Sequence, residues 1–191
     1  MTSLPDTLDE TYSRALSNIP DKHKKYAFRT FQWLIYASVP LRVDELADML
    51  ITGPHENDSV SPDERFLSPV KLIACCGTLV TTENITQNIL PINLQDHCVP
   101  LKRVLRLAHF SVQEYLVSRV TQDNNQLLID EFDAHLAIAG TSINYIMHIS
   151  HDPNYSNSSY ISEKYPLVSY AVKHWSFMQD ARKNYQAPPR R

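Results

Sequence analysis

Hydrophobic residues recur at helical spacing in three successive stretches near the start of the chain. The stretches cover residues 4–19, 21–38 and 42–50, and their apolar side chains stand three or four positions apart. Proline follows the first stretch at Pro20 and the second at Pro40, where it interrupts helical hydrogen bonding. Three helices with a short proline joint predict a helix-turn-helix core. The predicted inward positions are Leu8, Tyr12, Ala15, Leu16, Ile19, Ala27, Phe31, Leu34, Ile35, Val43, Leu46, Ala47 and Leu50.

Polar residues mark the starts of the first two predicted helices. Asp6 or Thr7 is placed to cap the first and Asp21 to cap the second, because such side chains accept hydrogen bonds from first-turn N–H groups. The second helix also carries a basic cluster, which we interpret as a solvent-facing side. The cluster comprises Lys22, His23, Lys24, Lys25 and Arg29.

A change of period after residue 50 predicts a β-hairpin. Residues 52–62 are polar and contain Gly53 and Pro54, which is typical of a loop, and a short helix is predicted over residues 68–75. Residues 79–82 and 101–108 are strand candidates, separated by the long polar connection 84–100. We expect the two strands to pair as a hairpin.

Directly after the second strand the spacing becomes helical again, over residues 110–120. Ser111 precedes Glu114 by three positions, which is the spacing of a capping box at a helix start. His109 falls at the joint between strand and helix, where exposed backbone N–H groups favour an anion. The predicted inward residues are Phe110, Val112, Tyr115, Leu116 and Val120.

The final part of the chain reads as two further helices after a polar break at residues 121–125. They cover residues 127–149 and 165–182, with a loop over 150–159 between them, and residues 186–191 form a tail. The whole pattern predicts a mainly α fold with a small β-hairpin. Inward positions are expected at Phe132, Leu136, Ala139, Ile143, Ile146, Met147, Leu167, Tyr170, Ala171, His174, Trp175 and Met178.

Composition narrows the class of protein. The 191 residues carry a net charge of -3, which gives no general attraction for nucleic acid or for an anionic membrane. No stretch of eighteen or more apolar residues occurs, and the first residues lack a basic and then apolar signal region. Three cysteines, an odd number, fit a reduced compartment, so a cytoplasmic location is expected.

The run Leu107-Ala-His-Phe-Ser-Val-Gln-Glu-Tyr-Leu116 resembles the motif that closes the winged-helix domain of NACHT-type STAND nucleotide switches. The resemblance is closest to fungal NLR-like proteins, in the module often named after GPI inositol-deacylase, and it covers most of the chain. It implies a winged-helix domain over residues 4–121 and a helical segment over 126–185. Further stretches similar to the family, in its order, are 4–12, 33–35, 40–41 with 44–47, and 165–167 through 173–175.

The resemblance also implies a function. The module would pack on a NACHT NTPase domain of the same protein and couple its nucleotide state to a C-terminal sensor of ankyrin or WD repeats, as in innate immunity. His109 is implied as a contact to the ADP phosphate, formed only with the NACHT domain present. No cofactor, metal, nucleic acid or membrane partner is expected for this chain alone, and ADP or ATP belongs to the full-length protein.

The sequence contains no motif that predicts an enzymatic activity. No glycine-rich phosphate loop is present, so the chain alone should not hydrolyse ATP. Cys75, Cys76, His97 and Cys98 lack the spacing of a zinc site, and we interpret them as buried or free side chains. The carboxylates at 44–45 and 63–64 are interpreted as a helix start and as solvated charge.

DNA binding is the alternative function, because winged-helix folds often place their third helix in the major groove. Here that helix is predicted over residues 42–50 and contains Asp44, Glu45 and Asp48 against a single arginine. Acidic side chains facing phosphates would oppose binding. The hairpin carries the basic residues Lys102, Arg103 and Arg106, but these do not outweigh the repulsion between the acidic helix and DNA.

Overall fold

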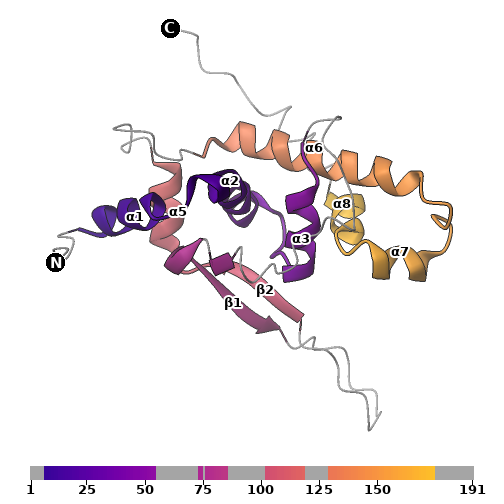
Figure 1. Ribbon diagram of the computed structural model, residues 1–191, viewed down its shortest axis with the longest axis horizontal. Helices are drawn as coiled ribbons and strands as arrows, with labels where there is room; N and C mark the ends of the chain where they lie inside the picture. Colours follow the sequence, from indigo (N-terminus) through magenta and orange to yellow (C-terminus); the bar gives the residue numbers. More distant parts are fainter. Residues whose placement is uncertain (1–6, 55–72, 75, 86–101, 119–128, 175–191) are drawn as a thin grey trace, which may run out of the picture.

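The computed structural model describes residues 7–54, 73–74, 76–85, 102–118 and 129–174 (Figure 1). These residues form seven α-helices and one two-stranded antiparallel sheet, which confirms the predicted mainly α fold with a small hairpin. The elements are α1 (Leu8–Ser17), α2 (Asp21–Tyr36), α3 (Val43–Ile51), β1 (Val80–Ile85), β2 (Lys102–Leu107), α5 (Phe110–Val117), α6 (Glu131–Ser150), α7 (Ser158–Lys164) and α8 (Val168–His174).

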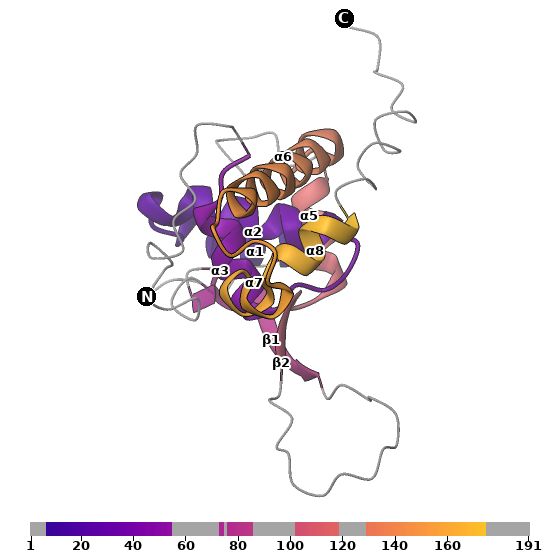
Figure 2. The same ribbon diagram turned by 90° about the vertical axis from the view of Figure 1, so that its right-hand side faces the viewer.

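The helices are arranged around α2, with the long helix α6 on one side and the hairpin on the other (Figure 1). Helices α1 and α5 lie together at one end of the molecule, and α7 lies at the opposite end. Figure 2 shows the same order from the side, with β1 and β2 projecting away from α6. Helix α6 packs on both α2 and α8, so it holds the last helices against the first ones.

Helix α1 begins as predicted but does not bury its whole apolar face. The Thr7 hydroxyl accepts a hydrogen bond from the Glu10 N–H at 3.2 Å, which confirms Thr7 as the cap. Leu16 and Ile19 are buried, whereas Leu8 is 63% exposed. The prediction for Leu8 was therefore wrong, because only the second half of this helix reaches the core.

Two predictions for helix α2 were wrong. Its cap position is Pro20, and Asp21 is instead the first helical residue, paired with Lys24 at 2.7 Å. Arg29 does not belong to a solvated face, since only 9% of it is exposed. Its guanidinium donates to the carbonyl oxygens of Met49 at 2.6 Å and Leu50 at 3.2 Å, and to that of Thr52.

The Arg29 contacts have a simple physical cause. The last carbonyl groups of a helix have no partner within the helix, and here they are those at the end of α3, which lies in the interior. A guanidinium offers five N–H donors in a fixed plane, so one side chain can satisfy several of these oxygens. The basic charge also opposes the negative end of the α3 dipole.

A second buried polar contact connects α3 to the C-terminal part of the chain. Asp48 is fully buried, and its carboxylate accepts hydrogen bonds from the Tyr145 hydroxyl of α6 and from the Leu167 backbone N–H at 3.5 Å. Glu45 is also buried and accepts from the Arg42 N–H at 2.7 Å. A buried carboxylate requires such hydrogen-bond donors. Asp48 and Glu45 therefore stabilise the packing of α3 inside the fold.

The hairpin has a regular register, from Val80 opposite Leu107 to Ile85 opposite Lys102. A third segment joins it, since Arg42 forms an isolated antiparallel bridge with Val104. The Leu105 N–H donates to the Leu41 carbonyl at 2.8 Å, in the joint between α2 and α3. The predicted strands are thus confirmed, while most of the predicted helix 68–75, apart from helical residues 73 and 74, and nearly all of the connection 84–100 lie outside the described residues.

Helix α6 turns a different side to the core from the one predicted. Three of the six expected inward residues are exposed: Leu136 (59%), Ile143 (42%) and Met147 (46%). The buried side instead carries Ala134, Ile138, Thr141, Ser142, Tyr145 and Ile149. Two small hydroxyl residues on this side allow close packing, and a polar residue such as Thr141 is not recognised by a search for apolar spacing alone.

The connection after α6 contains a helix that the sequence analysis missed. Helix α7 is capped by the Asn157 side chain, which accepts from the Tyr160 N–H at 3.1 Å. It brings Lys164 close to Asp152, which lies just after α6, at 2.9 Å. Asp152 also accepts from the Asn154 N–H and the Tyr165 hydroxyl, both at 2.9 Å.

Because of these donors, the stability that Asp152 gives to the α6–α7 connection depends on pH. The Asn154 N–H and then Lys164 lower the pKa of Asp152 from its ordinary value of 3.8 to about 2. The unfolded chain therefore takes up this proton at a higher pH than the folded chain does. The stabilisation is complete above about pH 4 and is lost as the pH falls toward 2.

We therefore predict that Asp152→Asn lowers the melting temperature at neutral pH. Between pH 4 and pH 2, the melting temperature of this variant should also fall less than that of the wild type. Thermal unfolding followed by circular dichroism across this range measures the effect. Glu163→Gln on α7 is the matched control, because this carboxylate is exposed and should leave the profile unchanged. Parallel profiles for wild type and Asp152→Asn would contradict the prediction.

Residues from both predicted parts of the chain belong to one hydrophobic cluster. The Trp33 ring of α2 packs on the Tyr170 ring of α8, with centroids 5.1 Å apart. Gly140 of α6 lies so close to the segment after α3 that an added Cβ would stand 2.4 Å from the Pro54 carbonyl oxygen. The predicted boundary between residues 121 and 126 lies outside the described residues, and the two flanking parts share their core.

Candidate interaction site around His109

His109 lies between β2 and α5, at the joint that the change of period predicts. Its backbone is extended, with φ −154° and ψ 154°, and its side chain caps α5. The Nδ1 atom accepts a hydrogen bond from the Ser111 backbone N–H at 3.2 Å. The cap predicted at Ser111 was wrong, because α5 begins one residue before Ser111 and the preceding histidine takes the cap position.

The capping contact determines which ring nitrogen of His109 is free to donate. A backbone N–H can only donate, so Nδ1 must present a lone pair to it. The ring proton of a neutral imidazole is then on Nε2. His109 is exposed, and its described hydrogen bonds are made by Nδ1. In the neutral ring, Nε2–H is then the donor that the exposed side chain presents at the surface.

Ser111 links the histidine to the first helix. Its hydroxyl lies 2.7 Å from Nδ1 of His109 and 2.6 Å from the hydroxyl of Tyr12 on α1. The Tyr12 ring packs on Tyr115 of α5, with centroids 5.4 Å apart. Burial raises the pKa of the Tyr115 hydroxyl, as expected for a closely packed joint between α1 and α5.

A cleft of about 290 Å³ opens beside His109, between β2, the start of α5 and the turn after α2. Phe110 is 66% exposed at this cleft and Val39 is 42% exposed, so the prediction that Phe110 points inward was wrong. These two side chains leave apolar surface beside the cleft. The lining residues are Trp33, Leu34, Ala37, Ser38, Val39, Pro40, Leu41, Leu105, Arg106, Leu107, His109, Phe110 and Gln113.

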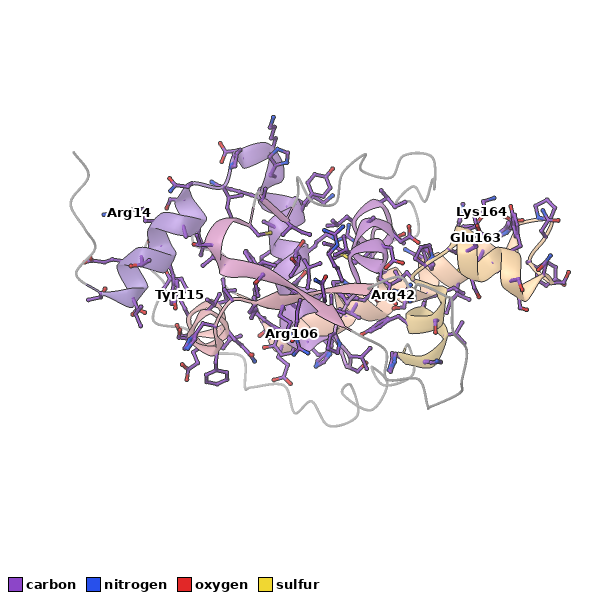
Figure 3. All side chains as sticks on the ribbon, turned by 90° about the horizontal axis from the view of Figure 1, so that it is seen from below. Arg14, Arg42, Arg106, Tyr115, Glu163 and Lys164 are labelled. Carbon is purple, nitrogen blue, oxygen red and sulfur yellow. The ribbon has the colours of Figure 1, made fainter. Side chains whose placement is uncertain are left out.

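Charge at this cleft comes from Arg106 of β2. Its Nε atom lies 2.8 Å from a carboxylate oxygen of Glu83 on β1, and both side chains are more than half exposed. An exposed pair of this kind is weak and readily exchanges its partner. In Figure 3, Tyr115 lies at the α1 end of the molecule and Lys164 at the opposite end, with Arg106 between them. The site therefore occupies the hairpin side of the fold, away from the Asp152 contact.

The other sequence candidates that the structure describes do not line this cleft. Cys76 is buried, while Cys75, His97, Cys98 and the carboxylates at 63–64 lie outside the described residues. Within the described ranges, no three metal-ligating side chains lie close enough to hold an ion. Asp44 pairs with Arg42 at 2.9 Å at the start of α3. None of the described helices has the length and apolar character needed to cross a bilayer.

The sequence singles out His109 as a candidate but does not indicate the residues that hold its side chain. Tyr12 was predicted only as part of an apolar helix face, and Ser111 was predicted as a cap. Tyr12 and Ser111 are separated by 99 positions, so neither residue carries a local signal of their contact. A tyrosine on a buried stripe is the one hint, because its hydroxyl requires a polar partner when covered.

Comparison with known proteins gives one distant relative. No protein-family model matches the chain, and no solved structure matches it. The chain is similar to azaphilone pigments biosynthesis cluster protein L of Monascus ruber, with 29% identity over 178 residues. The similarity covers 91% of this chain and 35% of the relative, so the chain spans about a third of the length of the curated protein that it matches.

Proposed function

We propose that this chain is a regulatory interaction module of an NLR-like signal-transduction ATPase, without activity of its own. It packs against a NACHT nucleotide-binding domain through the cleft beside His109. His109 contacts a phosphate of bound ADP, and the module passes the nucleotide state to a C-terminal sensor. The observation that carries this proposal is an exposed histidine whose Nδ1 is occupied and whose Nε2–H is free to donate.

Local electrostatics support the phosphate contact. The first N–H groups of a helix favour an anion, and His109 stands at this end of α5. A neutral imidazole can donate from Nε2 to a phosphate oxygen without losing the cap made by Nδ1. Arg106 lies on the same cleft and can exchange Glu83 for an anionic partner. The exposed Phe110 supplies apolar area for the domain contact.

The order of elements supports a winged-helix interpretation. Helices α2 and α3 are joined by a segment that bridges to β2, and the hairpin and α5 follow. The C-terminal helices then pack on α2 through a shared core, which suits a rigid transmitter. A switch of this kind requires two domain arrangements with different nucleotide affinity.

The Monascus ruber relative is longer than this chain, which corresponds to 35% of it, and this agrees with a module inside a longer protein. Its name places that protein in a gene cluster for azaphilone pigments and states no molecular activity. We propose for the present chain a signalling or regulatory role in the cytoplasm, within a longer polypeptide that contains the ATPase domain.

DNA binding is the weaker proposal. The helix predicted to enter the groove is α3, and six consecutive residues of it, 45–50, are buried. Helix α3 is packed between α2 and β2, so its side chains are committed to the core. Among the described residues, no observation favours a nucleic-acid partner over a protein domain.

We predict that His109→Asn weakens ADP retention by the complete protein encoded by the gene. Asparagine is a good helix cap, so it preserves the start of α5, but its shorter side chain removes the outward donor. Loss of one hydrogen bond to a charged phosphate corresponds to about tenfold to hundredfold weaker binding. Nucleotide copurifying with the protein and its release rate measure the effect.

Two further variants make the result interpretable. His109→Ala removes both the donor and the cap, so it should add a loss of stability to the loss of ADP. His151→Ala changes an exposed histidine outside the cleft and should retain ADP normally. A complete protein that binds no nucleotide, or that retains ADP equally with His109→Asn, would overturn the proposed role of His109.

A further inference from the structure

We propose that Tyr12 and Ser111 are positioning residues for His109, which they hold in the Nε2–H form through a chain of hydrogen bonds. The inference concerns the state of the imidazole itself, and only its use in nucleotide contact rests on the proposed function. The chain runs from the hydroxyl of Tyr12 through the hydroxyl of Ser111 to Nδ1 of His109, over 2.6 Å and 2.7 Å.

The direction of this chain follows from the available donors. Nδ1 already accepts from the Ser111 backbone N–H at 3.2 Å, so it carries no proton. The Ser111 hydroxyl therefore donates to Nδ1, and its oxygen is left to accept from the Tyr12 hydroxyl. Each bond polarises the next, which increases the preference for a proton on Nε2 over a proton on Nδ1.

The first member of the chain is fixed by packing. Tyr12 is half-buried, its ring lies 5.4 Å from that of Tyr115, and its helix is anchored by Leu16 and Ile19, which are 6% and 3% exposed. The His109 ring, by contrast, is exposed and makes its described hydrogen bonds only with Ser111. The orientation of His109 therefore depends on α1, an element nearly 100 residues earlier in the chain.

This dependence gives α1 a role beyond covering the core. A neighbouring domain that moved α1 away from α5 would break the contact between Tyr12 and Ser111. The Ser111 hydroxyl is then able to rotate away from Nδ1, so only the Ser111 backbone N–H favours a proton on Nε2, and the preference for this tautomer weakens. The first helix thus controls the donor that His109 presents at the cleft.

Nitrogen NMR of the imidazole tests the proposal on this chain directly. The shifts of Nδ1 and Nε2 of His109 are measured at pH 8, where an ordinary histidine is neutral. We expect the wild type to show Nε2–H as the main form. Tyr12→Phe keeps the ring that packs on Tyr115 but removes the first hydroxyl, and Ser111→Ala removes the second.

Each substitution should shift the ratio of the two tautomers about fivefold toward Nδ1–H, as the loss of one net hydrogen bond predicts. Ser111→Thr retains a hydroxyl and should restore the wild-type ratio, whereas Tyr155→Phe, at an exposed tyrosine, should not change it. Tyr12→Phe conserves volume and should keep the fold, so it remains informative if Ser111→Ala unfolds α5.

The two proposals fail in different ways. Unchanged tautomer ratios in both Tyr12→Phe and Ser111→Ala would overturn the positioning role, whatever the protein binds. A shifted ratio together with normal ADP retention in His109→Asn would leave the positioning role intact and remove its use in nucleotide contact. A wild type with Nδ1–H as the main form would also overturn the proposal.

Discussion

A chain that ends at residue 125 is expected to lose cooperative folding, although the sequence pattern divides the protein near this point. Deletion of the following residues uncovers Trp33, which is 1% exposed and packs on Tyr170. It also removes Tyr145 and Leu167, whose O–H and N–H groups bind the buried carboxylate of Asp48. Thermal unfolding followed by near-ultraviolet circular dichroism should show no sharp transition.

The size of this effect follows from the buried area. Each large apolar side chain returned to water costs about 1.5–3 kcal/mol, and several from α2 and α3 are uncovered together. The total matches or exceeds the free energy of unfolding of an ordinary domain, about 5–15 kcal/mol. An uncompensated carboxylate at Asp48 adds a further cost.

A shorter deletion provides the control. Removal of residues 186–191, which follow the last predicted helix, should preserve the transition of the complete chain. A sharp transition of the 1–125 chain at the temperature of the complete chain would contradict the prediction. The N-terminal part would then be an independent domain, and the core shared with α6 and α8 would contribute little to its stability.

The secondary structure of this protein follows largely from spacing in the sequence. Helices α2 and α3 and the hairpin appear within a few residues of their predicted bounds. Pro20 and Pro40 separate the first helices because proline cannot donate a backbone hydrogen bond. Patterns of this kind act over a few residues, so they are visible before any tertiary contact is known.

The side of a helix that faces the core is harder to predict. Helix α6 carries apolar residues around much of its circumference, so more than one stripe satisfies helical spacing. The structure buries the side with Thr141 and Ser142 and exposes Leu136 and Met147. The choice depends on the shape of α2 and α8, which a local pattern does not contain.

The contacts of the candidate site could not be predicted from local patterns either. His109 was located by a local change of period and by resemblance, whereas its partner Tyr12 lies on another helix nearly 100 residues away. Phe110 was predicted to point inward because it starts an apolar stripe, yet it lies in the first turn of α5 and is 66% exposed. Residues at helix ends are poorly predicted, since the stripe has no neighbour to pack on there.

Replacement of Arg29 by leucine is expected to destabilise the chain by about 3–5 kcal/mol, a large effect for a residue within a basic cluster. Leucine fills most of the volume but cannot donate, so the carbonyl groups of Met49, Leu50 and Thr52 lose a buried partner. Urea unfolding should show a lower midpoint with an unchanged slope, because the same surface is exposed on unfolding.

Lys25→Leu is the matched control, since Lys25 belongs to the same cluster on α2 but is exposed. Its replacement should change stability by no more than about 0.5 kcal/mol. Arg29→Lys should give an intermediate loss, because a compact ammonium cannot reach all the carbonyl oxygens that a planar guanidinium spans. Equal stability of Arg29→Leu and Lys25→Leu would show that Arg29 does not hold the end of α3. The basic residues of α2 would then form one solvated face, as their spacing in the sequence predicts.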